Sequence, residues 1–171
     1  MLTEAEKEKM LNRISKKAGD YEEVSISCSQ GPLCALQEEF NLGGGEDVIK
    51  AATFMPGLAS RKETCGAVIG GLMALGLVFG RDRVNNPDPN TPEAMEQVLK
   101  FREMAWRFCE EFKKAFGSTM CGDIRPMIMG RDYNTIDLKE RLQFFADGGP
   151  KKCRVPPETA ARIAAIIILE K

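Results

Sequence analysis

Residues 65–80 read Cys-Gly-Ala-Val-Ile-Gly-Gly-Leu-Met-Ala-Leu-Gly-Leu-Val-Phe-Gly, and this stretch decides the fold. It contains no charged residue, whereas Arg61 and Lys62 precede it and Arg81 and Arg83 follow it. The stretch is shorter than the roughly 20 apolar residues that a membrane-spanning helix needs, and it is rich in glycine. We therefore interpret it as the buried, glycine-rich central helix of a bundle.

Three glycines near the start of this helix, Gly66, Gly70 and Gly71, form a face of small residues. Because glycine has no Cβ atom, another helix or a cofactor can approach the backbone closely at these positions. We expect Gly66 and Gly70 to contribute to cofactor binding. Thr64 is a typical N-cap residue, which would place Cys65 in the first turn of the helix.

The sequence on both sides of this helix also predicts helices. Thr3 and Glu6 match a capping box, and we expect the helix that they begin to end at Gly19. Further helices are expected over residues 28–40, 46–54, 91–116 and 137–145 and from 156 onward, with a short helix or turn at 121–130 and a polar loop at 83–90. No segment alternates apolar and polar residues convincingly, so no strand is expected. The predicted fold class is all-α, a single-domain helical bundle over residues 1–171 with the helix of residues 1–19 at its periphery.

Composition and charge reduce the number of function classes that fit the chain. A chain of 171 residues with 43% hydrophobic residues is long enough for one full core. The net charge of -1 gives no basic footprint for nucleic acid, and the N-terminus shows no apolar signal region. We therefore expect a cytoplasmic protein that neither binds nucleic acid nor inserts into a membrane. The chain contains no histidine, which excludes imidazole catalysis and imidazole metal ligation.

The chain contains six cysteines, which are its remaining candidates for reactive or metal-binding residues. In a reducing cytoplasm, cysteines indicate metal binding, redox chemistry or buried packing before structural disulfides. Four of them lie at predicted helix starts: Cys28, Cys65, Cys121 and Cys153. A helix start concentrates unpaired N–H groups and partial positive charge, so we expect a lowered thiol pKa at these four positions.

The other two cysteines fit a packing role. Cys109 shares a predicted apolar helix face with Trp106 and Phe112, and Cys34 lies beside apolar residues, although its closeness to Cys28 leaves a role as a resolving thiol open. Successive members of the four-cysteine set are more than 30 residues apart, which matches neither a ferredoxin run nor a zinc ribbon. Spacing alone therefore leaves a metal site, a redox thiol pair and simple packing open.

The pattern of these cysteines resembles a known family of redox-active proteins that is named C_GCAxxG_C_C. The resemblance is carried by residues 28–30, 65–76 and 112–118, followed by Cys121 and Cys153, and it spans roughly residues 20–160. Its most specific part is the CGAxxGG block at residues 65–71. It implies that Cys28, Cys65, Cys121 and Cys153 form the characteristic set and that Cys34 and Cys109 lie outside it. Residues 54–60 depart from the glycine-rich stretch expected before this block, so we expect access to the site to differ here.

Three functions follow from these observations. The first is an electron carrier in which the four cysteines bind an iron–sulfur cluster and a redox partner protein exchanges electrons with it. The second is a metal-free thiol–disulfide oxidoreductase in which Cys65 attacks and Cys28 is its partner. The third is a helical module that holds a structural zinc ion or has incidental cysteines. An apolar helical surface is also expected to allow a homodimer.

Overall fold

The computed structural model describes residues 2–84 and 90–171, so residues 85–89 of the predicted polar loop lie outside the described residues. The described chain is all-α, as predicted, and its extended pairing is confined to one isolated β-bridge between Thr64 and Met120. The elements in chain order are α1 (Glu4–Ser25), α2 (Gln30–Phe40), α3 (Gly45–Ala51), the 3₁₀ turn η1 (Ala52–Phe54), α4 (Gly57–Ser60), α5 (Gly66–Phe79), α6 (Pro92–Phe116), α7 (Cys121–Met129), α8 (Leu138–Ala146), α9 (Gly149–Lys152) and α10 (Val155–Leu169).

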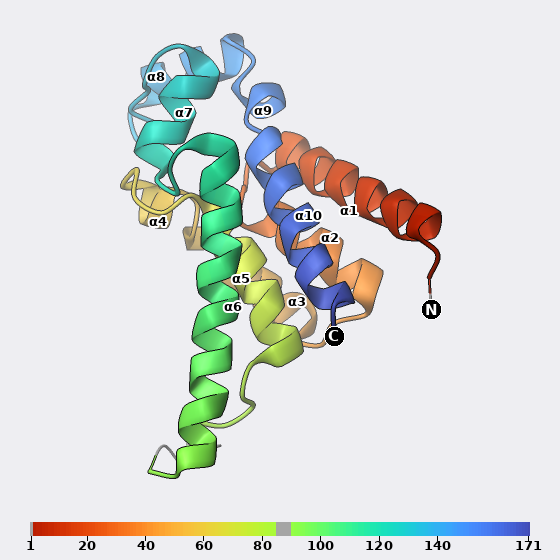
Figure 1. Ribbon diagram of the computed structural model, residues 1–171. Coiled ribbons are helices and arrows are strands. Elements are labelled where there is room, and N and C mark those ends of the chain that lie inside the picture. Colours follow the sequence, from red (N-terminus) through yellow and green to blue (C-terminus); the bar gives the residue numbers. More distant parts are fainter. Residues whose placement is uncertain (1, 85–89) are drawn as a thin grey trace.

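The glycine-rich helix α5 packs against α2, α6 and α10 (Figure 1). A Cβ atom at Gly70 would overlap the backbone carbonyl of Ser29, which lies just before α2. A Cβ atom at Gly71 would overlap the ring of Phe108, which is buried on α6. These two glycines therefore let the start of α2 and one face of α6 approach the α5 backbone closely.

The N-terminal helix is longer than predicted. It does not end at Gly19 but continues to Ser25, because Gly19 is a packing position on a continuous helix. A Cβ atom at Gly19 would overlap the side chain of Glu158 on α10. Ile14 and Leu11 lie about one and two turns earlier and are buried, and α1 packs against both α2 and α10.

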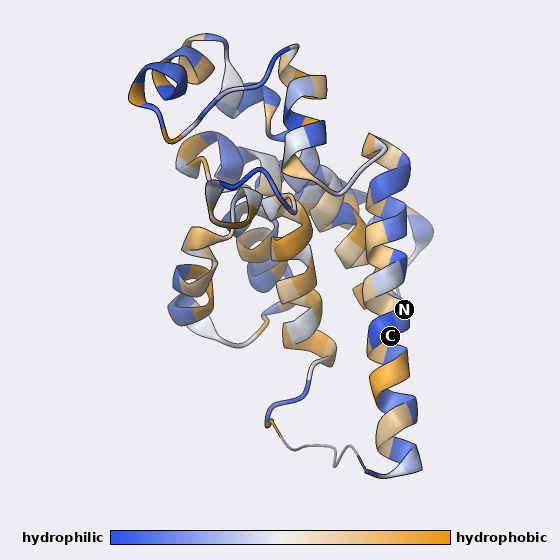
Figure 2. Cartoon of the chain, turned by 90° about the vertical axis from the view of Figure 1, so that its left-hand side faces the viewer, coloured by the Kyte–Doolittle hydropathy of each residue, from blue (hydrophilic) through white to orange (hydrophobic). Residues whose placement is uncertain are grey.

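The long helix α6 begins as predicted, with the Thr91 side chain accepting a hydrogen bond from the Ala94 N–H. Phe112 is fully buried, but Trp106 is 71% exposed, so the predicted apolar face is only partly covered. The N-terminal half of α6, which carries the exposed Met95 and Leu99, extends beyond the other helices (Figure 1, Figure 2). Trp106 lies in the C-terminal half of the helix, so this extension does not account for its exposure. None of the helices in residues 2–84 and 90–171 combines the length and apolar character of a membrane span.

Two hydrophobic clusters organise the interior. The larger cluster includes buried side chains of α1, α2, α5, α6 and α10. The smaller one consists of Met129, Tyr133 and Phe144, and it joins α7 to α8 at one end of the bundle. The Tyr133 hydroxyl donates a hydrogen bond of 2.6 Å to Asp147, which fixes the segment between these helices. The helices that carry the smaller cluster, α7 and α8, lie at one end of the bundle (Figure 1). Residues of both clusters line the cavity that holds the candidate site, Cys65 and Ile124 of the larger and Phe144 of the smaller.

Candidate functional site

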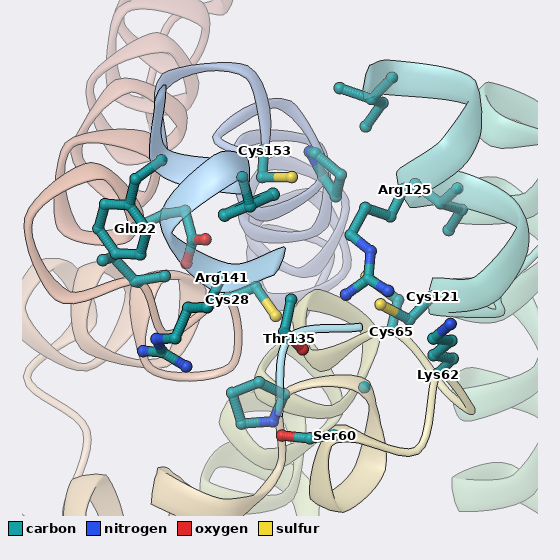
Figure 3. A pocket seen from close by; sticks show the side chains of 18 residues that line it. Glu22, Cys28, Ser60, Lys62, Cys65, Cys121, Arg125, Thr135, Arg141 and Cys153 are labelled. Atoms are coloured by element: carbon teal, nitrogen blue, oxygen red, sulfur yellow. The ribbon is translucent and has the colours of Figure 1, made fainter. Parts of the chain in front are cut away.

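The structure brings four of the six cysteines together in the lining of one cavity of about 130 Å³ (Figure 3). These are the four that the sequence singled out: Cys28, Cys65, Cys121 and Cys153. They come from four separate parts of the chain, and Cys34 and Cys109 do not line this cavity. The other lining residues are charged, polar or apolar: Glu22, Lys62, Arg125, Arg141, Ser60, Thr135, Ile26, Pro56, Gly57, Ile124, Ile128, Phe144, Phe145 and Pro156.

Backbone hydrogen bonds tie Cys65 to Cys121. The Cys65 N–H donates to the Thr119 carbonyl at 2.8 Å, and the Cys121 N–H donates to the Glu63 carbonyl at 2.7 Å. Because these bonds flank the β-bridge at Thr64, that residue is not the N-cap that the sequence predicted, and Cys65 itself occupies the N-cap of α5. The two cysteines are therefore held at the starts of α5 and α7 by a short two-stranded contact.

Cys28 is positioned by the close contact between the start of α2 and α5. Ser29, the N-cap of α2, is fully buried, and its hydroxyl donates a hydrogen bond of 2.8 Å to the Ala52 carbonyl. A Cβ atom at Gly66 would overlap the Cys28 sulfur, so this glycine makes room for that sulfur. Gly66 and Gly70 lie at the contact with this segment and outside the cavity lining, and the cofactor contact expected of them stays a prediction.

Cys153 lies directly after α9 and two residues before α10, rather than inside the first turn of a helix. Its N–H donates to the Gly149 carbonyl at 2.8 Å. The next residue, Arg154, forms ion pairs with Asp20 and Glu23 of α1 at 2.7 Å each. This network fixes the end of α1 against the start of α10, on either side of the cavity.

The Cys28 and Cys65 thiols lie close enough for each to shift the pKa of the other through a hydrogen bond. A hydrogen bond from the Cys28 thiol lowers the pKa of Cys65; burial opposes this effect, and the backbone N–H groups of Ala67 and Val68 add to it. The same hydrogen bond to Cys65, together with burial, raises the pKa of Cys28 well above its ordinary value. Cys65 is therefore the sulfur that ionises first, and Cys28 keeps its proton.

The other two cavity cysteines behave differently. Burial raises the pKa of Cys121 to about 11 and that of Cys153 to about 12, and Arg125 lowers both only in part. The pKa of Cys65 is thus lowered chiefly by the Cys28 hydrogen bond and only in part by N–H groups at the helix start, whereas the expected lowering of the pKa does not hold for Cys28, Cys121 and Cys153. Burial, which the sequence did not reveal, raises the pKa at Cys121 and Cys153, and at Cys28 the hydrogen bond to Cys65 has the larger effect, followed by burial.

The sequence analysis did not identify two ionisable residues of the cavity, Glu22 and Arg125. Glu22 is 3% exposed, and burial, followed by the charge of Cys65, raises its pKa well above the ordinary value. Arg125 is buried and donates through Nη2 to Asp132 at 2.7 Å and to the Tyr133 carbonyl at 2.6 Å. Glu22 follows Ala18 by four residues, so a longer predicted α1 would have placed it on the buried face.

Glu22 makes stability depend on pH. Its folded-state pKa is raised above the unfolded value of about 4.3, so the folded chain keeps a proton that the unfolded chain releases as pH rises. The stability contributed by this group is fully present below that unfolded value and is lost as pH rises toward the folded-state pKa. We expect Glu22→Gln to be more stable than the wild type in urea unfolding at pH 7 to 8, with the difference disappearing near pH 4. Glu96→Gln, at an exposed position of α6, is the matched control and should show no such dependence.

A left-handed segment forms part of the cavity wall. Leu58, Ala59, Ser60 and Lys62 all have positive φ, with values from 43° to 64°, which L-residues seldom adopt. Ser60 and Lys62 line the cavity. Leu58, Ala59 and Ser60 belong to the stretch where the sequence departs from the glycine-rich pattern of the family that it resembles. Positive φ at these residues strains the backbone, and backbone strain of this kind is characteristic of functional sites.

The donor arrangement tests the metal hypotheses. Within residues 2–84 and 90–171, no three Cys, Asp or Glu side chains are grouped so that they hold one metal ion. A single four-thiolate zinc ion therefore does not fit the arrangement. Four thiols lining one cavity are the kind of donor set that an iron–sulfur cluster uses, and the closeness of Cys28 to Cys65 is that of a thiol pair.

A comparison with protein families gives one match. The family model described as "Putative redox-active protein (C_GCAxxG_C_C)" matches residues 26–167, which include all four cavity cysteines. Comparisons with curated proteins and with solved structures gave no match.

Proposed function

Because the chain belongs to the C_GCAxxG_C_C family of putative redox-active proteins, we propose that it exchanges electrons through a Cys28–Cys65 thiol pair. The hydrogen-bonded contact of these two sulfurs inside a cavity carries this proposal. Cys65 is the attacking sulfur, since its surroundings favour the thiolate, and Cys28 is the resolving sulfur. Among the functions considered from the sequence, this geometry supports thiol–disulfide exchange best.

The exchange proceeds in two steps. The Cys65 thiolate attacks one sulfur of a substrate disulfide, which forms a mixed disulfide and releases the other substrate sulfur as a thiolate. That thiolate takes up the proton that Cys28 loses. The Cys28 sulfur then attacks the Cys65 sulfur, which forms the Cys28–Cys65 disulfide and releases the second substrate sulfur as a thiolate, which is protonated by solvent. The substrate gains two electrons, the cysteine pair loses two, and a redox partner protein with a dithiol restores the pair.

A redox titration tests this function. The reduced protein is equilibrated without oxygen in glutathione buffers of increasing oxidation, and free thiols are then alkylated and counted. We expect two of the six thiols to disappear in one two-electron transition. Cys34→Ser and Cys109→Ser, which alter cysteines outside the cavity, should show the same transition. A chain that keeps all its thiols up to the most oxidising buffer would contradict the proposal.

A second candidate function rests on a different observation, the convergence of all four cysteines on one cavity. In this version Cys28, Cys65, Cys121 and Cys153 hold an iron–sulfur cluster, which supplies one-electron transfer when bound. The Ala67 and Val68 N–H groups that donate to Cys65 would stabilise negative charge on the ligand sulfurs. Anaerobic purification followed by iron, acid-labile sulfide and absorption measurements separates the two. Stoichiometric iron and sulfide would favour the cluster, and colourless protein with the two-thiol transition would favour the pair.

The redox partner protein and the homodimer stay predictions. The exposed apolar side chains of α6, Met95 and Leu99 in its protruding N-terminal half and Trp106 further along the helix, are the surface where we would look for a second copy. Sedimentation equilibrium at several protein concentrations measures whether the chain self-associates.

A further inference from the structure

Two buried polar atoms stand out among the residues that the structure describes. Glu22 Oε2 and Arg125 Nε are the buried side-chain nitrogen and oxygen atoms that have no hydrogen-bond partner. Both residues line the four-cysteine cavity, and in the view of Figure 3 they reach toward it from opposite sides. Because burying a polar group without a partner is unfavourable, this coincidence indicates a ligand that supplies partners to both.

The charge of the cavity indicates the chemistry of that ligand. Arg125, Lys62 and Arg141 contribute positive charge to the described lining, and Glu22 is its one acidic residue. Burial raises the pKa of Glu22 and so favours its neutral form, which leaves these charges uncancelled and can donate a hydrogen bond to an oxygen of the ligand. An anionic ligand is therefore favoured over a cationic one.

Arg125 is prepared to bind such an anion. Its Nη2 is already engaged by Asp132 and by the Tyr133 carbonyl, which fixes the plane of the guanidinium group. Lys62 also pairs with Asp132, so the arginine is held from one side while its Nε–H is left without an acceptor. A guanidinium group that is fixed in this way suits a carboxylate, to which arginine donates strong hydrogen bonds.

We propose that the substrate of this site is a low-molecular-weight disulfide that carries a carboxylate, with the carboxylate at Arg125 and the disulfide beside Cys65. The volume of about 130 Å³ limits the substrate to a small molecule, and Ile124, Ile128 and Phe144 offer apolar contacts to its methylene groups. This assignment rests on the proposed exchange chemistry, and it adds the selectivity of the site. The bonds that form and break are those of the exchange described above.

Three disulfides of similar length test the selectivity. Dithiodiglycolate has carboxylate ends, bis(2-hydroxyethyl) disulfide has neutral ends, and cystamine has ammonium ends. The second-order rate constant for oxidation of the reduced protein is measured with each and divided by the rate constant with reduced dithiothreitol, which removes intrinsic reactivity. We expect dithiodiglycolate to exceed the neutral disulfide by about tenfold or more, and cystamine to be the slowest.

Substitutions identify the residue responsible. Arg125→Gln should reduce the ratio of the dithiodiglycolate rate to the neutral rate to about one, and Arg125→Lys should restore part of it. Arg102→Gln, at an exposed position of α6 outside the cavity, is the matched control and should leave the ratio unchanged. A wild-type ratio near one, with both disulfides reduced, would overturn the carboxylate assignment and leave the exchange function standing.

A ligand that does not react separates the remaining outcomes. Adipate has the shape of dithiodiglycolate with methylene groups in place of the sulfurs, and 1,6-hexanediol is its neutral counterpart. We expect calorimetry to detect binding of adipate to the wild type, weaker binding to Arg125→Gln, and no binding of hexanediol. Adipate binding without any disulfide reduction would support the carboxylate site and contradict the exchange function. Absence of adipate binding together with equal rates would overturn the carboxylate site.

Discussion

Cys65→Ser is expected to lower the rate of disulfide reduction by about three orders of magnitude or more. A serine hydroxyl does not ionise near neutral pH, and it cannot form a disulfide, so both the attack and the product are lost. Cys65 is 5% exposed and receives hydrogen bonds from Cys28 and from two backbone N–H groups, an arrangement that none of the other cysteines shares among the described residues. The rate is measured from the thiol released by a small disulfide under anaerobic conditions.

Three further variants control this result. Cys34→Ser and Cys109→Ser remove thiols that lie outside the cavity, and both should keep the wild-type rate. Cys28→Ser should leave the first step intact and stop the second, so that a mixed disulfide accumulates on Cys65 and appears as an added mass. If Cys65→Ser kept more than a tenth of the wild-type rate, Cys65 would not be the attacking sulfur.

Gly70→Ala is expected to lower the free energy of unfolding by about 3 kcal/mol. The added Cβ would overlap the Ser29 carbonyl and press on the Pro32 ring, and neither group can rotate away as a flexible side chain does. The start of α2 would have to move from α5, and Cys28 would move with it. Urea unfolding measures the change in stability, and the rate of Cys28–Cys65 disulfide formation measures the effect on the site.

The same helix supplies a matched control. Gly76 is exposed, and a Cβ atom there would meet nothing within 4 Å. Gly76→Ala should therefore raise the free energy of unfolding by about 0.5 to 1 kcal/mol, because alanine favours the helix over glycine. Equal effects of the two substitutions would show that α2 does not pack on α5 at Gly70.

The elements that the sequence predicted well are those whose ends are set by local chemistry. Thr91 and Pro92 mark the start of α6, and Asp137 caps α8 through a hydrogen bond from the Glu140 N–H. Gly19 was misinterpreted because a glycine that ends a helix and a glycine that admits a neighbouring helix look alike in sequence. Only the position of Glu158, 139 residues further along the chain, distinguishes the two.

The candidate site was also predicted in part, and its remaining features could not be predicted from the sequence. The four cysteines that the sequence singled out line one cavity, and the glycines beside Cys65 proved to be the contacts that bring the Cys28 segment onto α5. The sequence did not predict the thiol pKa values, because these depend on burial. It also missed Arg125, whose partner is Asp132 and not the nearer Asp123. Burial and long-range pairing follow from packing between distant segments, and a single sequence does not state them.

The pairing of Cys28 with Cys65 can be measured directly. The reduced, metal-free protein is oxidised with one equivalent of diamide, the remaining thiols are alkylated, and the peptides are mapped by mass spectrometry without reduction. We predict that one intramolecular disulfide dominates and that it links Cys28 to Cys65. A disulfide that instead links Cys121 to Cys153, or that recruits Cys34 or Cys109, would contradict this pairing, as would a chain that forms no intramolecular disulfide.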